Sequence, residues 1–355
     1  MAITRPFRPC GPGYGPCARP RDRGETSKGT NLSIRLLIKI AVSLAVLSAI
    51  FLLLPWADVR TAVARLSPLV WLGVLAGFLA GHRIAVEKWR RLINAGRASL
   101  RSVDAVRCYA AGLFANLCLP SIVGGDVLRA ALATRATGRA EATVLGSVAD
   151  RVIDIFGLAI LLGTGAFLTR DLLPDMGSAL IGVGMLVGVL AAMIALPLVL
   201  RTPIRRWPRK LRRPVGRALV ALRYLSRDRG TALFALGVSL TVQGSFVLLN
   251  WWIGSSLGID VPVAAWFFAW PLAKLAGLLP VGINGLGVRD ATLGALFVPL
   301  GVPMASGVVA SLVWQSVLIG GGLLGGLYWW AASRRRGLPV AVTRRLAVAS
   351  GNKHG

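Results

Sequence analysis

The sequence predicts an all-α polytopic membrane protein. Of its 355 residues, 55% are hydrophobic and only 15% are charged, whereas a typical soluble domain is about 45–50% apolar and about 25% charged. The mean hydropathy is +0.67, and the apolar residues are grouped in runs close to the roughly 20 residues that a helix needs to cross a bilayer. These observations exclude a soluble globular enzyme and a disordered chain.

The net charge of the chain has two possible causes. Forty-one Lys and Arg residues stand against 14 Asp and Glu, which gives a formal charge of +27. Such an excess is typical either of nucleic-acid binding or of cytoplasmic loops under the positive-inside rule. The basic residues lie in short runs between long apolar segments. We therefore attribute the charge to membrane topology and to attraction for anionic lipids, and we expect no nucleic-acid partner.

The apolar segments divide the chain into a transmembrane domain at 34–332 and two basic tails, both expected in the cytoplasm, at 1–33 and 333–355. The first tail is rich in Pro, Gly and Arg and is predicted to be disordered. Six apolar runs are long enough to be full spans: 36–55, 68–86, 144–168, 177–200, 231–257 and 303–332. Two further apolar segments, 108–123 and 263–300, are interrupted by Pro and Gly.

The basic loops decide how the two interrupted segments are threaded. Loops 87–107 and 201–230 are both strongly basic. If 108–123 crossed the membrane completely, loop 201–230 would lie outside, against the positive-inside rule. A hairpin that enters and leaves on the cytoplasmic side removes this conflict. The same reasoning makes 263–300 a hairpin from the outer face. The sequence therefore predicts about six full spans and two re-entrant hairpins, with both termini in the cytoplasm.

The two hairpins carry similar residues at their tips. The first tip contains Leu119-Pro120, Gly124-Gly125-Asp126 and Arg129, and the second contains Leu279-Pro280, Gly285, Gly287 and Arg289-Asp290. Because the hairpins enter from opposite faces, the pattern indicates an inverted repeat, and paired Gly/Pro-broken segments mark the binding site of many transporters. Glycine allows a tight turn, and a helix that starts after it points its positive end at an anion. The alternative is that both segments are loops at the membrane surface.

Charged residues also occur inside an expected span, at Asp150-Arg151-Val152-Ile153-Asp154. Asp150 and Asp154 are four residues apart and share a helix face, and Arg151 is within pairing distance of Asp154. A charge in a span costs about 2.5–3.5 kcal/mol on insertion scales, so it normally faces a cavity or a partner. Lys274, in the second hairpin, is a candidate partner for either aspartate. The alternative is a neutralised pair near the inner interface.

Enzymatic chemistry finds little support in the sequence. His82 and His354 are the only histidines, and no serine-nucleophile, Walker or dinucleotide-binding pattern is present. The four cysteines are predicted to be unpaired thiols without a metal. We therefore expect no catalytic residues, no metal and no cofactor. Four polar residues in the spans are interpreted as hydrogen-bonding groups between helices: Gln243, Asn250, Ser311 and Gln315.

In their order and spacing these motifs resemble the lysylphosphatidylglycerol synthase transmembrane-region family, which contains flippase-like integral membrane proteins of bacteria and archaea. The resemblance covers about residues 35–332 and includes Gly112-Leu113-Phe114-Ala115-Asn116 before the first tip. The family often carries Glu after the second-hairpin Arg, and Asp290 keeps the carboxylate here. Full-length synthases continue into a soluble aminoacyl-transfer domain, whereas 23 residues follow Ala332. The resemblance therefore implies lipid translocation rather than aminoacyl transfer.

The leading hypothesis is a flippase-like transporter of the bacterial inner membrane. It is expected to move a polar or anionic lipid, such as a phospholipid or a polyprenyl or terpenoid lipid, through a basic cavity formed between the two re-entrant hairpins. Its expected substrate-binding residues are Gly124, Gly125, Asp126, Arg129, Asp150, Arg151, Asp154, Lys274, Gly285, Gly287, Arg289 and Asp290. Two alternatives stay open: a membrane-embedded lipid or glycosyl transferase, and a non-transporting partner of a lipid-modifying enzyme.

Overall fold

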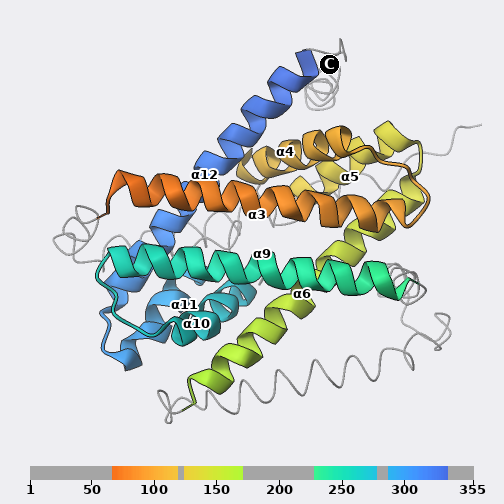
Figure 1. Cartoon of the computed structure of the whole chain (residues 1–355). Helices are drawn as coiled ribbons and strands as arrows, with labels where there is room; N and C mark the ends of the chain where they lie inside the picture. The colour runs from red at the N-terminus through yellow and green to blue at the C-terminus, as the bar shows by residue number, and fades with distance from the viewer. Residues whose placement is uncertain (1–65, 119–123, 171–227, 278–286, 335–355) are drawn as a thin grey trace, which may run out of the picture.

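The computed structural model describes residues 66–118, 124–170, 228–277 and 287–334, and every regular element in these ranges is helical (Figure 1). The elements are α3 (Pro68–Asn94), α4 (Ser102–Cys118), α5 (Gly124–Thr137), α6 (Ala140–Leu168), α9 (Arg229–Ser256), α10 (Val263–Ala276), α11 (Val288–Phe297), the 3-10 turn η3 (Val298–Leu300) and α12 (Met304–Arg334). The predicted all-α fold is confirmed for these residues.

Four of the described helices, α3, α6, α9 and α12, are long and apolar enough to cross a membrane. They correspond to the expected spans 68–86, 144–168, 231–257 and 303–332. The expected spans 36–55 and 177–200 lie outside the described residues, and so do the parts of the two hairpin tips at 119–123 and 278–286. The count of six spans and the re-entrant path of the hairpins therefore stay predictions.

Helix α3 continues eight residues beyond the end expected at residue 86, so the connection expected at 87–107 is shorter than predicted. Trp89, Leu92 and Ile93 are fully buried in this extension, because the apolar face of the helix carries on through it. The extension also brings Lys88 into the helical bundle rather than into a cytoplasmic loop.

Helices α3 and α9 run antiparallel and in close contact (Figure 1). Gly73, Gly77 and Gly81 of α3 face Trp252, Leu249 and Phe246 of α9 in that order, and a Cβ at any of the three glycines would lie within 3 Å of the facing side chain. One glycine in each turn therefore provides the space in which the large α9 side chains sit.

The two hairpins occupy opposite ends of this helix pair. Helices α4 and α5 lie beside the C-terminal half of α3, whereas α10 and α11 lie near the C-terminal end of α9 (Figure 1). Helix α12 contacts both hairpins: Gly322 faces Leu117 of α4, and Gly307 contacts Gly294 of α11. A single long helix thus connects the two hairpins.

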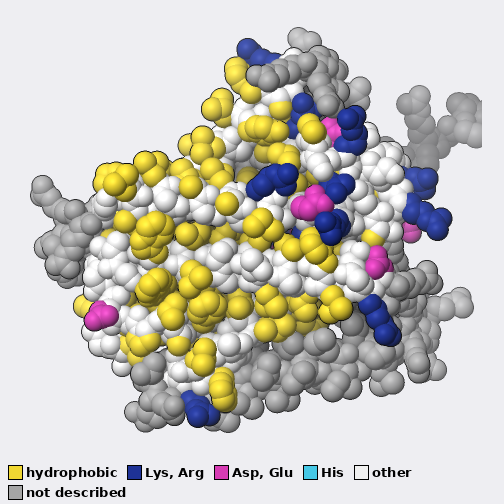
Figure 2. All heavy atoms as spheres, viewed as in Figure 1, with side chains coloured by type: hydrophobic (Ala, Val, Ile, Leu, Met, Phe, Trp, Pro, Cys, Tyr) yellow, Lys and Arg dark blue, Asp and Glu magenta, His cyan; other side chains and the backbone are white. Residues whose placement is uncertain are grey.

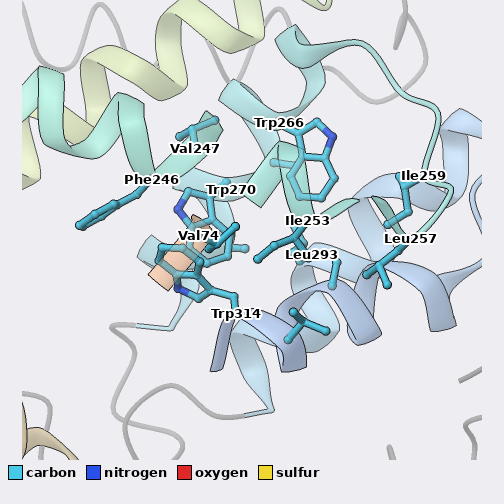
Figure 3. Packing of buried hydrophobic residues seen from close by; sticks show 14 of the residues in the cluster. Val74, Phe246, Val247, Ile253, Leu257, Ile259, Trp266, Trp270, Leu293 and Trp314 are labelled. Carbon is cyan, nitrogen blue, oxygen red and sulfur yellow. The ribbon is translucent and has the colours of Figure 1, made fainter. Parts of the chain in front are cut away.

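The largest buried apolar cluster joins α3, α9, α10, α11 and α12 (Figure 3). At its centre Trp314 meets Trp270 edge to face, with 5.4 Å between the ring centroids, and Phe246 at 5.7 Å. Trp266 packs against Phe297 at 4.6 Å. Because aromatic pairs of this kind add about 0.5–1.5 kcal/mol beyond their buried area, this cluster fixes the second hairpin against the long helices.

The outer surface of α3 and α9 is divided by residue type. Figure 2 shows hydrophobic side chains along most of the two helices and charged side chains gathered where α3 ends and α9 begins. At that end the Asp228 carboxylate accepts hydrogen bonds from the hydroxyl and the N–H of Thr231, which cap α9 and lower the pKa of Asp228. An apolar band with one charged end is the pattern of a helix pair that crosses a membrane.

Candidate functional site

A cavity of about 180 Å³ lies between α3, α4, α5, α6, α9 and α10. Its charged lining residues are Lys88, Asp126, Arg129, Asp150, Arg151, Asp154 and Lys274. The structure therefore brings the charged residues predicted at the first tip and in α6 together with Lys274, although these come from three segments of the sequence.

The outer part of this lining is a set of ion pairs between α5 and α6. Arg151 donates to the Asp126 carboxylate. The Arg129 Nε lies 3.3 Å from Oδ1 of the same carboxylate. Arg129 Nη2 then donates to Asp150 Oδ2 at 2.7 Å. The Arg129 guanidinium also lies over the ring of Tyr109, 4.9 Å from its centroid.

The inner part of the lining depends on Lys88. Its Nζ lies 3.0 Å from Asp150 Oδ1 and 2.5 Å from Asp154 Oδ1, and the side chain is 3% exposed. Asp154 also accepts from the Ser239 hydroxyl at 2.7 Å. Asp150 and Asp154 therefore do face the same side of α6, as their spacing predicted, but the expected pair between Arg151 and Asp154 is not formed, because Lys88 occupies that side.

Together these contacts form a continuous row of alternating charges, which we call the ion-pair chain: Arg151, Asp126, Arg129, Asp150, Lys88 and Asp154. Three cations and three carboxylates make the chain neutral as a whole. Because a buried charge costs far less when it is paired, the chain allows six charged groups to line one cavity.

Lys274 is the one cation in the lining outside the ion-pair chain. Its Nζ donates to Gln243 Oε1 at 2.6 Å, and no ion pair joins it to a carboxylate among the described residues. Gln243 in turn donates from Nε2 to the Asp154 carbonyl at 3.0 Å. Gln243 thus forms the interhelical hydrogen bonds expected of it, whereas Asn250 donates within its own helix, to Phe246. Lys274 leaves the lining with one uncompensated positive charge.

The glycines of the first hairpin permit a close helix crossing. A Cβ on Gly125 would lie 2.3 Å from both Asn116 Oδ1 and the Gly112 carbonyl. The Gly125 N–H donates to Asn116 Oδ1 at 3.0 Å, so this N–H, which was expected to face a ligand, is bound by the protein itself. Gly124 is the first residue of α5, and Gly285 of the second tip lies outside the described residues.

The charged pair of the second hairpin does not line the cavity. Arg289 Nη2 donates to Asp290 Oδ1 at 2.8 Å and to Gln315 Oε1 at 3.1 Å, and Arg289 Nε donates to the Ser311 hydroxyl at 3.2 Å. Asp290 is 0% exposed and accepts from the N–H of Gly287, whose φ of +85° requires glycine. Arg289 and Asp290 therefore form a separate buried cluster with α12.

The cavity also contains polar residues with side chains suited to binding that were not among the predicted site residues, notably Lys88, His82 and Tyr109. Lys88 was assigned to a loop, although it continues the helical spacing of Ala85 and Leu92 on the buried face of α3. His82 and Tyr109 also line the cavity, where His82 Nδ1 and the Tyr109 hydroxyl are 3.2 Å apart. Extending the apolar periodicity of the second span by two turns would have identified Lys88.

An all-helical bundle with apolar spans and a charged cavity defines a polytopic membrane protein. The chain matches the family model "Lysylphosphatidylglycerol synthase TM region" over residues 36–326. It therefore belongs to this family of membrane proteins linked to lipid metabolism or transport, whose TM region is the non-catalytic part of the synthase-like proteins. Comparisons with curated proteins and with solved structures gave no match. The family inferred from the sequence motifs is confirmed.

Proposed function

We propose that the protein is a flippase-like transporter that moves a polar or anionic lipid between the leaflets of the bacterial inner membrane. The supporting observation is Lys274, whose ammonium group faces a cavity in which every other charge belongs to the neutral ion-pair chain. An unpaired charge at membrane depth is costly, and the phosphate of a lipid head group would supply the missing negative charge. The cavity would therefore bind an anionic head group in preference to a neutral one.

The size of the cavity supports a head group as its occupant. Its volume of about 180 Å³ is below the roughly 300–1,000 Å³ of pockets that enclose a whole drug-sized ligand. A head group would fit inside, and the acyl chains would remain in the bilayer. Such an arrangement suits movement of a lipid from one leaflet to the other without extraction from the membrane.

The contacts of α12 support hairpins that end inside the membrane. Leu117, just before the first tip, contacts Gly322, and Arg289, just after the second tip, contacts Gln315. These two α12 positions are seven residues apart, about 10 Å along a helix, and both lie near the middle of Met304–Arg334. We accordingly propose two re-entrant hairpins that approach mid-membrane from opposite faces, with the basic end of the bundle and both termini in the cytoplasm.

Reconstitution tests this function. The purified protein in liposomes that carry fluorescent phosphatidylglycerol should move the lipid between leaflets, as measured by quenching of outer-leaflet label. Lys274→Met should slow this movement about tenfold, the effect of losing one charge-assisted interaction, and should affect fluorescent phosphatidylcholine less. Arg91→Gln, in an exposed ion pair with Glu87, is the control and should match the wild type.

The same assay separates the alternatives. If the wild-type protein moves neither lipid, the transport function is wrong. A change in the chemical identity of the labelled lipid, seen by chromatography, would indicate a transferase. An inactive protein that restores the activity of an added lipid-modifying enzyme would indicate a partner subunit.

A further inference from the structure

We propose that the ion pair between Arg151 and Asp126 is a lateral gate of the cavity, and that the phosphate of an incoming lipid opens it by replacing Asp126 on Arg151. The proposal rests on the proposed transport of a lipid and adds how the head group enters and which groups select it.

The position of Arg151 is the first observation. Its side chain is 50% exposed, and the next turn of α6 carries Ile155, which is 49% exposed. Both residues line the cavity as well. Val127 of α5, beside Asp126, is 62% exposed. Arg151 therefore lies on the boundary between the polar cavity and an apolar outer surface, which is the path of a lipid that enters from the bilayer.

The second observation is how the pair holds the first hairpin. Asp126 is the third residue of α5 and lies directly after the first tip. Two salt bridges join α5 to α6: Asp126 with Arg151, and Arg129 with Asp150. Asp150 and Arg129 are each only 4% exposed, so the Arg151 link is the one that a molecule outside can reach. Its release would free the end of α5 and leave the inner link intact.

The third observation is that Asp126 has a second cation available. The Arg129 Nε lies 3.3 Å from Asp126 Oδ1, yet this buried donor makes no hydrogen bond. If Asp126 leaves Arg151, its carboxylate can accept from the Arg129 Nε and satisfy that donor. Arg151 would then bind the lipid phosphate, for which the planar guanidinium is well suited. The exchange leaves every member of the ion-pair chain paired.

This exchange predicts effects of opposite sign at the two partners. Asp126→Asn removes the group that competes with the lipid for Arg151. The protein should therefore be half-saturated at a lower concentration of phosphatidylglycerol. Arg151→Gln removes the group that receives the phosphate, so half-saturation should require a higher concentration of phosphatidylglycerol. Each shift should be about tenfold, the effect of one charge-assisted hydrogen bond. An ion pair with a purely structural role would give the same sign at both partners.

The measurement is retention of phosphatidylglycerol by the purified protein, titrated in detergent and read by native mass spectrometry. Asp154→Asn is the comparison for charge alone, because it changes the cavity charge by the same amount as Asp126→Asn but leaves the gate in place; it should shift half-saturation less than Asp126→Asn does. Glu87→Gln, outside the cavity, should leave retention unchanged. If Arg151→Gln does not purify, Arg151→Lys should give a smaller loss in the same direction.

Two outcomes would overturn the gate: shifts of the same sign in Asp126→Asn and Arg151→Gln, or an equal shift in Asp154→Asn and Asp126→Asn. The readout is independent of transport. A protein that retains phosphatidylglycerol but fails to move it in liposomes would disprove the proposed function, and the signs of the two shifts would still decide the gate.

Discussion

The two helical hairpins contain the same charged residue types near their tips but place them in different surroundings. In the first hairpin, Asp126 and Arg129 line the cavity and belong to the ion-pair chain. In the second hairpin, Arg289 and Asp290 bind each other and Ser311 of α12, away from the cavity. In the first pair, Asp126 has both Arg129 and Arg151 within reach and can change partner. In the second pair, the charged groups are already hydrogen-bonded to each other and to α12.

This difference shows that an Arg and an Asp near a broken hairpin do not by themselves indicate a binding site. The partner helix decides the outcome. Helix α6 presents carboxylates and a further cation to the first hairpin, and so creates a charged cavity. Helix α12 presents a hydroxyl and an amide to the second hairpin, which complete a closed hydrogen-bond network. We expect the first hairpin to serve binding and the second to serve stability.

The largest expected loss of stability distinguishes the second hairpin from the first. Asp290→Ala would leave the Arg289 guanidinium buried without its carboxylate and should lower the free energy of unfolding by about 3–5 kcal/mol. Asp126→Ala should cost about 1 kcal/mol or less, because its partner Arg151 is half-exposed. Reversible unfolding of both purified variants in mixed micelles would measure the two values. Equal losses would show that both pairs have the same structural role.

A smaller loss of stability is expected when glycines of the two hairpins are replaced by alanine. Gly125→Ala would force a Cβ to within 2.3 Å of two oxygen atoms at the crossing of α4 and α5, and overpacking of this kind costs about 1–3 kcal/mol. Gly277→Ala, after α10, meets its nearest neighbour at 3.4 Å with a φ of −64° and should change stability little. Thermal unfolding of the two variants provides the comparison. A larger loss at Gly277 would contradict the tight crossing in the first hairpin.

The smallest loss of stability is expected outside both hairpins, at Glu87 on the surface of α3. It gives the reference value for removing an exposed charge. Glu87 pairs with Arg90 and with Arg91 on the same helix, and the side chains of Glu87, Arg90 and Arg91 are 26%, 26% and 50% exposed. Exposed pairs at this spacing contribute about 0.3–0.5 kcal/mol, so Glu87→Gln should lower the melting temperature only slightly, and the difference should shrink in high salt. A loss comparable to that of Asp290→Ala would mean that exposure does not set the cost of these pairs.

Local features of the site could be predicted from the sequence, and long-range ones could not. The shared face of Asp150 and Asp154 follows from a spacing of four residues in a helix, and the structure places both on Lys88. Lys88 itself was missed, because the apolar run was ended at residue 86 although the helix continues to Asn94.

The partners of Arg289 and Lys274 depend on tertiary packing. Arg289 contacts Ser311, 22 residues away, and Lys274 contacts Gln243, 31 residues away. No local period connects such positions, so which of the two cations faces the cavity could not be inferred from spacing. Similar tip sequences suggested equivalent roles, and the packing against α6 and α12 made the roles different.

The burial of Lys88 also has a consequence for biosynthesis. Its carboxylate partners are on α6, and 66 residues separate it from Asp154. At synthesis rates of roughly 5–20 residues per second, α3 emerges from the ribosome roughly 3–13 s before its counter-charges do. During that interval a lone ammonium group opposes release of α3 into lipid. We therefore expect release of α3 into lipid to become more favourable once α6 supplies the two carboxylates that pair with Lys88.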